Sequence, residues 1–246
     1  MSKKNKIRLF AFQELEVGQT YTPNEAQSHY LKNVMRLKSG DDVFLFDGMS
    51  GEFKSTVSAC GKKELTLKIE EKVLNFEKSP DIWLLFALLK KENTDIVLQK
   101  AVELGASKII PVQTEYTQKQ AFKPERARLQ IIEAAEQSRR LDIPSLENLT
   151  SLPDLLQNWP SSRKLIYLNE TGEGNSFFDA QQSLNAPAAL LIGPEGGFSK
   201  KELEILKNMA YTQSVTMGRR ILRAETACVA ALACWQAFCG DWRTSK

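Results

Sequence analysis

Short runs in which apolar and polar residues alternate dominate residues 1–72. Three of these runs, at 42–46, 51–57 and 64–69, predict strands, because a period of two turns one apolar face toward a core. Glycine and aspartate separate the runs, and a helical pattern over residues 25–34 precedes them. Several short strands at close spacing predict a small β-barrel.

Beyond residue 80, apolar runs suited to buried strands alternate with helical patterns. Strands are expected at 82–89, 108–112, 164–168, 188–192 and 214–217, and helices at 94–104, 124–139 and 224–238. Gly105 suits the end of the first helix and Pro124 the first turn of the second. This alternation predicts an α/β fold in which a parallel sheet carries helices on both faces. The change of pattern places a domain boundary between residues 72 and 80.

The composition is that of an ordinary globular protein. The 246 residues are 42% hydrophobic and 26% charged, enough for one large or two modest domains. The net charge is +3 and no segment is strongly basic, so binding to nucleic acid would have to come from local clusters. No apolar run approaches the roughly 20 residues of a membrane span. The basic N-terminus lacks the apolar stretch of a secretory signal, so we expect a cytoplasmic protein that contacts no membrane.

Several kinds of catalytic site are excluded by residues that the sequence lacks. Cys60, Cys228, Cys234 and Cys239 form no CxxC pair, and three of them fall in one predicted helix, which favours reduced thiols over disulfides or a metal site. The motifs GxGxxG (after the first α/β strand), GxxxxGK[ST] and HExxH are absent. The single histidine, His29, lies outside the α/β part, which excludes a Ser-His-Asp triad within that domain.

The most distinctive local segment is LLIGPEGGFSKKE, residues 190–202. An apolar strand leads into a Gly/Pro turn and then a helix, whose start is specified by the capping box Ser199-x-x-Glu202. The carboxyl ends of strands are where α/β sheets bind ligands, and glycines there let a ligand approach the bare backbone. A plain strand-to-helix turn is the alternative interpretation.

Three further segments carry charged residues in or next to predicted helices. In MGRRILRAETA, residues 217–227, a glycine follows a strand, and three arginines and a glutamate surround the start of a small-residue helix. A basic surface loop before a core helix is the alternative interpretation. The helical segments QKAVELG (99–105) and EAAEQSRR (133–140) carry opposite charges at i, i+3 spacing. Solvated helix faces are the simplest interpretation of most of those charges.

Taken together and in order, these segments resemble the 16S rRNA uracil-N3 methyltransferase family, which belongs to the SPOUT class of S-adenosylmethionine (SAM) enzymes. The match runs over nearly the whole chain. It includes RLF at 8–10, HYL at 29–31, VMRLKSGD at 34–41, LFDG at 45–48, the QKAVELG and EAAEQSRR helices, the IGPEGGFS loop and GRRILRAETA. The departures are small: Asn33 stands where arginine is common, and Ala224 where threonine is common.

The resemblance implies two domains: a PUA-like β-barrel over residues 1–74 that grips RNA, and a SPOUT-type α/β domain over residues 75–246 with a mostly parallel sheet and a C-terminal trefoil knot. It implies methylation of N3 of a specific uridine in 16S rRNA, with SAM as the cofactor and the small ribosomal subunit or its precursor as the setting. It also implies a homodimer with the C-terminal helix in the interface, and the alanine-rich face of residues 224–237 is consistent with that. No metal is implied.

The family's cofactor pocket is built from three loops of the knot. On this sequence the loops map to Leu168, Asn169 and Glu170; to Ile192, Gly193, Pro194, Glu195, Gly196 and Gly197; and to Met217, Gly218, Ile221, Leu222, Arg223, Thr226 and Ala227. Apolar side chains among them can form a slot for adenine, and the glycines expose backbone groups that can hydrogen-bond to a ligand.

Uracil N3 can attack a methyl group only after its proton has left, so a group in the site must accept that proton or stabilise the anion. We expect Arg223 or Arg220 to stabilise the anion, and Glu225 to orient that arginine or to take the proton. Because Watson–Crick pairing engages the N3 edge, the target base has to be unpaired or extruded.

Phosphate contacts are expected from four basic residues of the first domain, Arg8, Lys32, Arg36 and Lys38. Two other functions stay open: another SPOUT enzyme that methylates a ribose 2′-OH or guanine N1, and an RNA-binding scaffold without catalysis. The intact glycine loop and GRRILRAETA segment argue against the scaffold.

Overall fold

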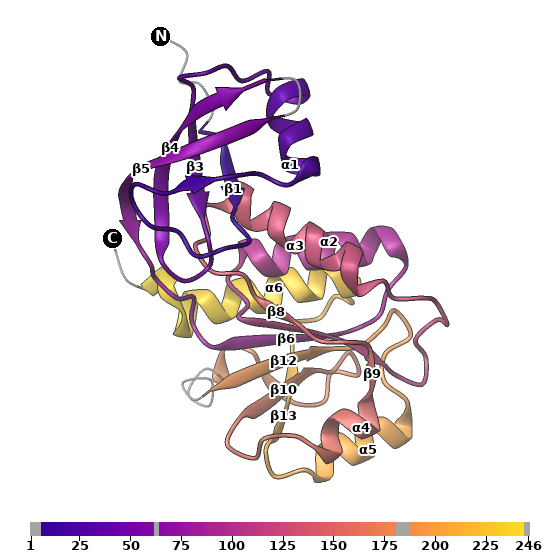
Figure 1. Ribbon diagram of the computed structural model, residues 1–246. Coiled ribbons are helices and arrows are strands. Elements are labelled where there is room, and N and C mark those ends of the chain that lie inside the picture. Colours follow the sequence, from indigo (N-terminus) through magenta and orange to yellow (C-terminus); the bar gives the residue numbers. More distant parts are fainter. Residues whose placement is uncertain (1–5, 62–63, 181–186, 244–246) are drawn as a thin grey trace. The chain divides into compact units, whose positions relative to one another are not determined.

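The computed structural model describes residues 6–61, 64–180 and 187–243 (Figure 1). The chain divides into two compact units, each described here by itself. The first unit takes the chain to Lys78 and adds Ala135–Ile143; the second comprises Ser79–Ala134 and Pro144–Lys246. The domain limits expected from the sequence, 1–74 and 75–246, remain a prediction about the functional parts of the chain.

The first unit is built around a five-stranded sheet. Its elements are β1 (Arg8–Phe10), β2 (Thr20–Tyr21), α1 (Glu25–His29), the π-helical turn η1 (Tyr30–Val34), β3 (Asp42–Phe46), β4 (Gly51–Cys60) and β5 (Leu65–Asn75). The strand order is β1-β3-β4-β5-β2. β1 pairs parallel with β3, and the other pairs are antiparallel.

Alternation explains why these segments are strands. Val43, Leu45, Phe53, Leu67 and Ile69 all turn inward and are fully buried in one core. The three longer strands confirm the prediction, although β4 and β5 run further than expected, and register shifts interrupt their pairing. The pattern missed β1 and β2, which have three and two residues and are too short to show a period.

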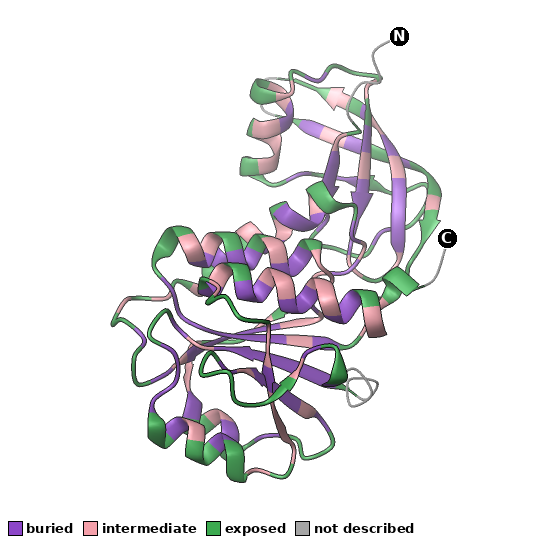
Figure 2. Ribbon diagram, turned by 180° about the vertical axis from the view of Figure 1, so that it is seen from behind, coloured by how far each residue is buried: buried purple, intermediate pink, exposed green. Residues whose placement is uncertain are grey.

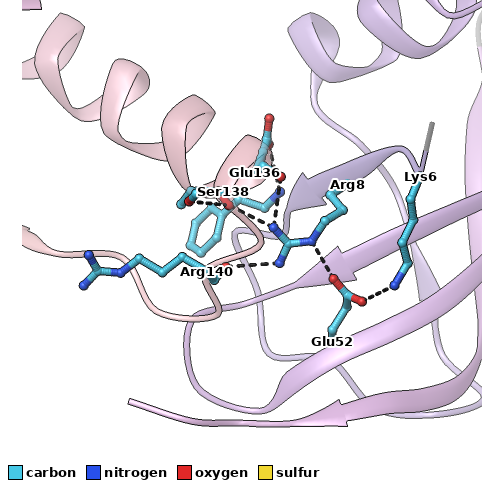
Figure 3. A network of polar contacts seen from close by, with 8 residues as sticks. Lys6, Arg8, Glu52, Glu136, Ser138 and Arg140 are labelled. Atoms are coloured by element: carbon cyan, nitrogen blue, oxygen red, sulfur yellow. Dashed lines mark hydrogen bonds and ion pairs between the residues drawn. The ribbon is translucent and has the colours of Figure 1, made fainter. Parts of the chain in front are cut away.

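Arg8 holds residues 135–143 against the sheet of the first unit (Figure 3). Its guanidinium donates from Nε to Glu52 Oε1 at 2.5 Å, from Nη1 to the carbonyls of Ala135 and Glu136 at 2.9 Å, and from Nη2 to the carbonyl of Arg140 at 3.1 Å. Those carbonyls are accessible because α3 ends there, with the next residue in the left-handed region. A cation at the C-terminus of a helix also complements the helix dipole.

The expectation that Arg8 contacts an RNA phosphate is therefore wrong. Arg8 is 6% exposed and its guanidinium is engaged by protein acceptors, so it is not available to an RNA phosphate. Glu136 and Arg140 do not lie on solvated helix faces: Glu136 Oε1 accepts from the backbone N–H of Phe10 at 2.9 Å, and Arg140 forms a buried ion pair with Asp142 at 2.8 Å.

The second unit holds a mixed succession of strands and helices around an eight-stranded sheet. Its elements are β6 (Ile82–Ala87), α2 (Lys91–Glu103), β7 (Lys108–Gln113), most of α3 (Pro124–Ser138), β8 (Ser145–Leu146), β9 (Thr150–Ser151), α4 (Leu152–Gln157), β10 (Lys164–Leu168), β11 (Asn175–Ser176), β12 (Ala188–Ile192), α5 (Lys200–Asn208), β13 (Thr212–Thr216), α6 (Ala224–Cys239) and η3 (Asp241–Arg243). The order is β11-β13-β10-β12-β6-β7-β8, with β9 also on β7. The strand pairs of the described sheet are parallel.

Both faces of this sheet are covered by helices, as the sequence predicted. Leu85, Leu165 and Leu191 share a core cluster with Leu152 of α4 and Leu206 of α5. The residues between them on the strands point to the opposite face, where Figure 1 shows α2 and α6. The central strands are accordingly buried (Figure 2), β12 along its whole length.

The four cysteines are free thiols, as predicted. Burial raises the pKa of the Cys228 thiol well above its ordinary value, and the charge of Glu225 raises it further. A thiol in that state is protonated at neutral pH and is no nucleophile. Among the described residues, no helix is long and apolar enough to cross a membrane, and no three metal-ligating side chains come together.

Candidate active site

Three neighbouring strands of the second unit end at the same edge of its sheet. β10 lies between β13 and β12 and runs parallel to both. The carboxyl ends of these strands therefore lie side by side, and so do the loops that follow them. The first loop spans residues 169–174, the second 193–199 and the third 217–223.

The three loops and the start of α6 enclose a pocket of about 790 Å³, counting the space open to solvent. Its wall is made of Leu168, Asn169, Glu170, Thr171, Ile192, Gly193, Pro194, Glu195, Gly197, Phe198, Leu203, Thr216, Met217, Gly218, Arg219, Arg220, Ile221, Leu222, Ala224 and Ala227.

Most of the residues that the sequence suggested for a cofactor lie in this wall. Arg220, expected in catalysis, also lies in it. Among the described residues, four suggested ones lie outside the wall: Gly196, Arg223, Glu225 and Thr226. Six residues of the wall were not suggested by the sequence: Thr171, Phe198, Leu203, Thr216, Arg219 and Ala224. Five of these adjoin the suggested segments in sequence, whereas Leu203 comes from α5 and carries no local signal.

Asn169 shapes the first loop from within. Its side-chain Oδ1 accepts from the backbone N–H of Thr171 at 3.1 Å, and its Nδ2 donates to the carbonyl of Glu173 at 3.2 Å. Gly174 ends the loop with φ +128°. A Cβ added to this glycine would lie 2.8 Å from the carbonyl oxygen of Ser214. The loop is therefore fixed by its own side chain and by a close backbone approach.

The second loop is a tight turn followed by a well-specified helix start. Gly197 has φ +69° and donates from its N–H to the carbonyl of Pro194 at 2.9 Å. The Ser199–Glu202 capping box is present as predicted, with the Ser199 N–H donating to Glu202 Oε2 at 2.9 Å and the Glu202 N–H donating to Ser199 Oγ at 3.2 Å. The Glu170 carboxylate of the first loop lies against Gly197, in space that a side chain there would fill.

The third loop presents three arginines, Arg219, Arg220 and Arg223, all exposed and none in an ion pair with a described residue. Ile221 beside them is 79% exposed. Glu225, in the first turn of α6, has a buried Oε2 without a hydrogen-bond partner. The structure does not pair this carboxylate with the arginines of the loop, and the oxygen is left able to accept a hydrogen bond.

The three remaining basic residues suggested for RNA lie on η1 and the turn after it. Lys32 Nζ donates to the carbonyl of Gly61 at 2.8 Å, whereas Arg36 and Lys38 are exposed. Arg36 has φ 54°, a left-handed conformation that is uncommon outside glycine.

Comparison with known protein families gives a match for each of two parts of the chain. Residues 77–236 match the model of the RNA methyltransferase domain, and residues 23–70 match that of the RNA methyltransferase PUA domain. The chain thus combines an RNA methyltransferase domain with an N-terminal RNA methyltransferase PUA domain.

Comparison with individual proteins identifies the family more specifically. The chain is 36% identical over 207 residues to ribosomal RNA small subunit methyltransferase E of Rickettsia conorii, covering 83% of this chain and 84% of the relative. It superposes on a methyltransferase of Legionella pneumophila in complex with the cofactor SAM (TM-score 0.88, 30% identity, 97% of this chain and 100% of that one). It also superposes on the SAM-bound methyltransferase E of Neisseria gonorrhoeae (TM-score 0.88, 29% identity, 97% and 100%). The chain belongs to the ribosomal RNA small subunit methyltransferase E family, which confirms the resemblance found in its sequence.

Proposed function

We propose that this protein transfers the methyl group of SAM to N3 of a specific uridine in 16S rRNA, in the cytoplasm and on the small ribosomal subunit or its precursor. The observation that carries the proposal is the three-loop pocket at the carboxyl ends of β13, β10 and β12. The SAM complexes of two relatives with nearly the same fold support the choice of cofactor.

The residues of the pocket suit SAM. Ile192, Met217 and Leu222 provide apolar surface for the adenine, while Gly193 and Gly197 leave backbone groups within reach of a ligand. The carboxylates of Glu170 and Glu195 are suited to the ribose hydroxyls or to the cationic groups of the cofactor. Bound there, SAM supplies an electrophilic methyl group, and the loops contribute by fixing its position relative to the incoming base.

The decisive test uses small-subunit rRNA from a strain that lacks this protein. The RNA is incubated with the protein and labelled SAM, digested, and analysed by nucleoside mass spectrometry, with the modified nucleotide then mapped. We expect 3-methyluridine at one position. A ribose-methylated nucleotide or 1-methylguanosine would identify a different reaction, and no incorporation would contradict the proposal.

The third loop offers the groups that N3 chemistry needs. Loss of the N3 proton leaves an anion spread over O2 and O4, which an arginine stabilises by charge-assisted hydrogen bonds. Arg220 lines the pocket, and Arg223 follows it at the N-cap of α6. The unsatisfied Oε2 of Glu225 is suited to hold an arginine once RNA is present, or to receive the proton.

Replacement of Arg223 by alanine is expected to lower kcat by about 10- to 100-fold at saturating SAM and RNA, since a hydrogen bond to a charged group contributes about 1.5–3 kcal/mol. Single-turnover methylation with labelled SAM measures the rate. Arg128→Ala, which removes an exposed arginine from α3, is the control and should keep the parent rate. An Arg223→Ala rate equal to that of the parent would remove Arg223 from this role.

Exposed cations of the first unit are proposed to hold the RNA backbone, with Arg36 and Lys38 foremost. Each cation that neutralises a phosphate releases counterions, so the logarithm of the binding constant falls linearly with the logarithm of the salt concentration. For Arg36→Ala/Lys38→Ala we expect this slope to flatten by about 1.4–1.8, the contribution of two phosphate contacts. Fluorescence anisotropy titrations at several salt concentrations measure it.

The matched control is Lys68→Ala/Lys72→Ala, which removes the same charge from exposed positions of β5. Its slope should equal that of the parent protein. If the Arg36→Ala/Lys38→Ala slope also equals the parent slope, these two residues do not contact phosphate.

We further propose that the chain forms a homodimer through α6 and that its C-terminal part is knotted. An apolar surface near the end of α6 supports the dimer: Phe178 packs edge-on against Phe238 and remains 61% exposed, and Trp242 is 58% exposed. The path from β13 to α6 supports the knot, because it passes the ends of β10 and β12 before α6 packs on β12 and β6. Sedimentation equilibrium at working concentration gives the number of chains.

A further inference from the structure

Tyr116 lies beside the second pocket loop without belonging to the wall of the pocket. It follows β7, so its loop emerges from the same edge of the sheet as the three pocket loops. A methyl group on Gly196 would lie 3.6 Å from the Tyr116 Cβ and 3.7 Å from its Cδ2, so the tyrosine is in contact distance of the bare backbone of the second loop. The side chain is nevertheless 52% exposed.

The loop that carries Tyr116 is held firmly in shape. The hydroxyls of Thr114 and Thr117, both buried, lie 2.8 Å apart, and the Thr114 N–H donates to Thr117 Oγ1 at 3.0 Å. Gln113 Nε2 lies 3.3 Å from the carbonyl oxygens of both threonines. These bonds satisfy the backbone groups of the turn within the loop itself, which keeps the Tyr116 Cα in one place.

A single carboxylate joins this loop to the second pocket loop. Glu202 is 6% exposed; its Oε1 accepts from the Glu115 N–H at 2.9 Å, and its Oε2 accepts from the Ser199 N–H at 2.9 Å. Glu202, which completes the capping box of α5, thus also fixes the distance between the Tyr116 loop and the second pocket loop. Burial of a carboxylate costs free energy, which here is offset by hydrogen bonds to both of its oxygens. Such a link is more than an ordinary surface loop requires.

The surroundings of Tyr116 indicate what it contacts. Glu115, Gln118 and Lys119, its neighbours in the loop, are polar and exposed. A rigid aromatic side chain among polar, exposed neighbours suits a planar ring partner whose edges stay in water. Unpaired nucleobases bind proteins in this way, by stacking on aromatic side chains beside groups that face the RNA backbone.

We propose that Tyr116 stacks on an unpaired base of the RNA substrate and thereby holds the strand beside the cofactor pocket. The stacked base is the target uracil or the nucleotide next to it. This inference rests on the proposed function, because it takes RNA to be the substrate. Tyr116 acts as a positioning residue, and its ring carries the effect while its hydroxyl does not.

Three replacements separate stacking from other roles. Tyr116→Ala removes the ring, Tyr116→Leu keeps apolar bulk without a π face, and Tyr116→Phe keeps the ring without the hydroxyl. Anisotropy titrations with a labelled RNA fragment spanning the methylated nucleotide should show a Kd raised about 5- to 150-fold for alanine and leucine, and close to the parent value for phenylalanine. SAM affinity by calorimetry should be unchanged in all three. Leu129→Ala, which truncates a 63% exposed side chain of α3, is the control for loss of apolar surface and should bind like the parent.

RNA with an abasic site at the target, or at either neighbour, identifies the stacked base. At that position the parent loses affinity and Tyr116→Ala loses no more, because the partner of the missing ring is already absent. Additive losses at every position would overturn the inference, as would a phenylalanine variant as weak as the alanine variant. A Tyr116→Ala protein that binds RNA like the parent but sediments as a different oligomer would assign Tyr116 to a protein contact instead.

The stacking and the proposed methylation can fail independently. If the parent methylates no RNA, the same titrations with a short oligouridine still measure the stacking directly. If the parent methylates rRNA while Tyr116→Ala and Tyr116→Leu bind it with the parent Kd, the proposed function stands and the stacking is wrong.

Discussion

Leucine in place of Ala227 is expected to abolish SAM binding while α6 remains formed. Ala227 is 7% exposed, lies in the first turns of α6 and forms part of the pocket wall, so an added isopropyl group projects into space that the cofactor needs. Leucine is among the better helix formers, so the change acts through volume and not through helix propensity. Calorimetric titration should give no measurable heat at SAM concentrations that saturate the parent, and methylation should be lost with it.

Ala230→Leu provides the matched control. It makes the same replacement three residues further along α6, at a half-buried position outside the pocket wall. This variant should bind SAM like the parent, and a thermal melt of both variants shows whether overpacking, which costs about 1–3 kcal/mol in a tight core, has loosened the fold. Parent-like SAM affinity in Ala227→Leu would mean that the cofactor does not enter this pocket.

Replacement of Arg8 by methionine is expected to destabilise the first unit by about 3–5 kcal/mol, the cost of leaving a buried charge without its partner. Glu52 is 1% exposed and would keep only Lys6, which bonds its Oε2 at 2.5 Å. The carbonyls of Ala135, Glu136 and Arg140 would lose their donor at the same time. Segment 135–143 should then separate readily from the sheet.

Hydrogen exchange followed by mass spectrometry is the suitable readout. All four tryptophans, Trp83, Trp159, Trp235 and Trp242, lie in the second unit, so tryptophan fluorescence does not report on the first. Peptides from β4 and from residues 135–143 should lose protection in Arg8→Met and regain most of it in Arg8→Met/Glu52→Leu, which removes both charges.

Lys54→Ala breaks the more exposed ion pair with Asp42 and should change protection little. Parent-like protection of β4 and residues 135–143 in Arg8→Met would show that the Arg8 network does not hold the unit together.

The regular elements of this fold were accessible from the sequence because their patterns are long enough to have a period. Strands β3, β10 and β12 were predicted with their observed bounds, and α6 to within one residue. Strands of two or three residues, such as β1 and β11, have no period to read and are created by pairing with a neighbour.

The parts of the site that could be predicted are those in which the backbone conformation requires particular residue types. Gly197, with its positive φ, and the Ser199–Glu202 capping box mark the second loop, and Gly218 marks the third. Leu203 and Tyr116 show no such signal, because Leu203 joins the pocket wall through the packing of α5 and Tyr116 comes to lie beside the second loop through the order of strands in the sheet.

The role of Arg8 could not be predicted from its charge and its position in the sequence. An arginine near a basic N-terminus is typical of an RNA contact, but the partners that bury this one are Glu52 and backbone carbonyls more than a hundred residues away. Nothing local distinguishes the two situations. Glu136 likewise has a distant partner, the backbone N–H of Phe10, whereas the buried Arg140 pairs with Asp142, two residues further along the chain.

The most direct test of the proposed cofactor site is a crystal structure of the protein grown with saturating SAM. Electron density for the cofactor should lie between the loops that follow β10, β12 and β13, in contact with Ile192, Gly197 and Ala227. Ordered SAM at any other place on the chain, with this pocket empty, would contradict the proposal.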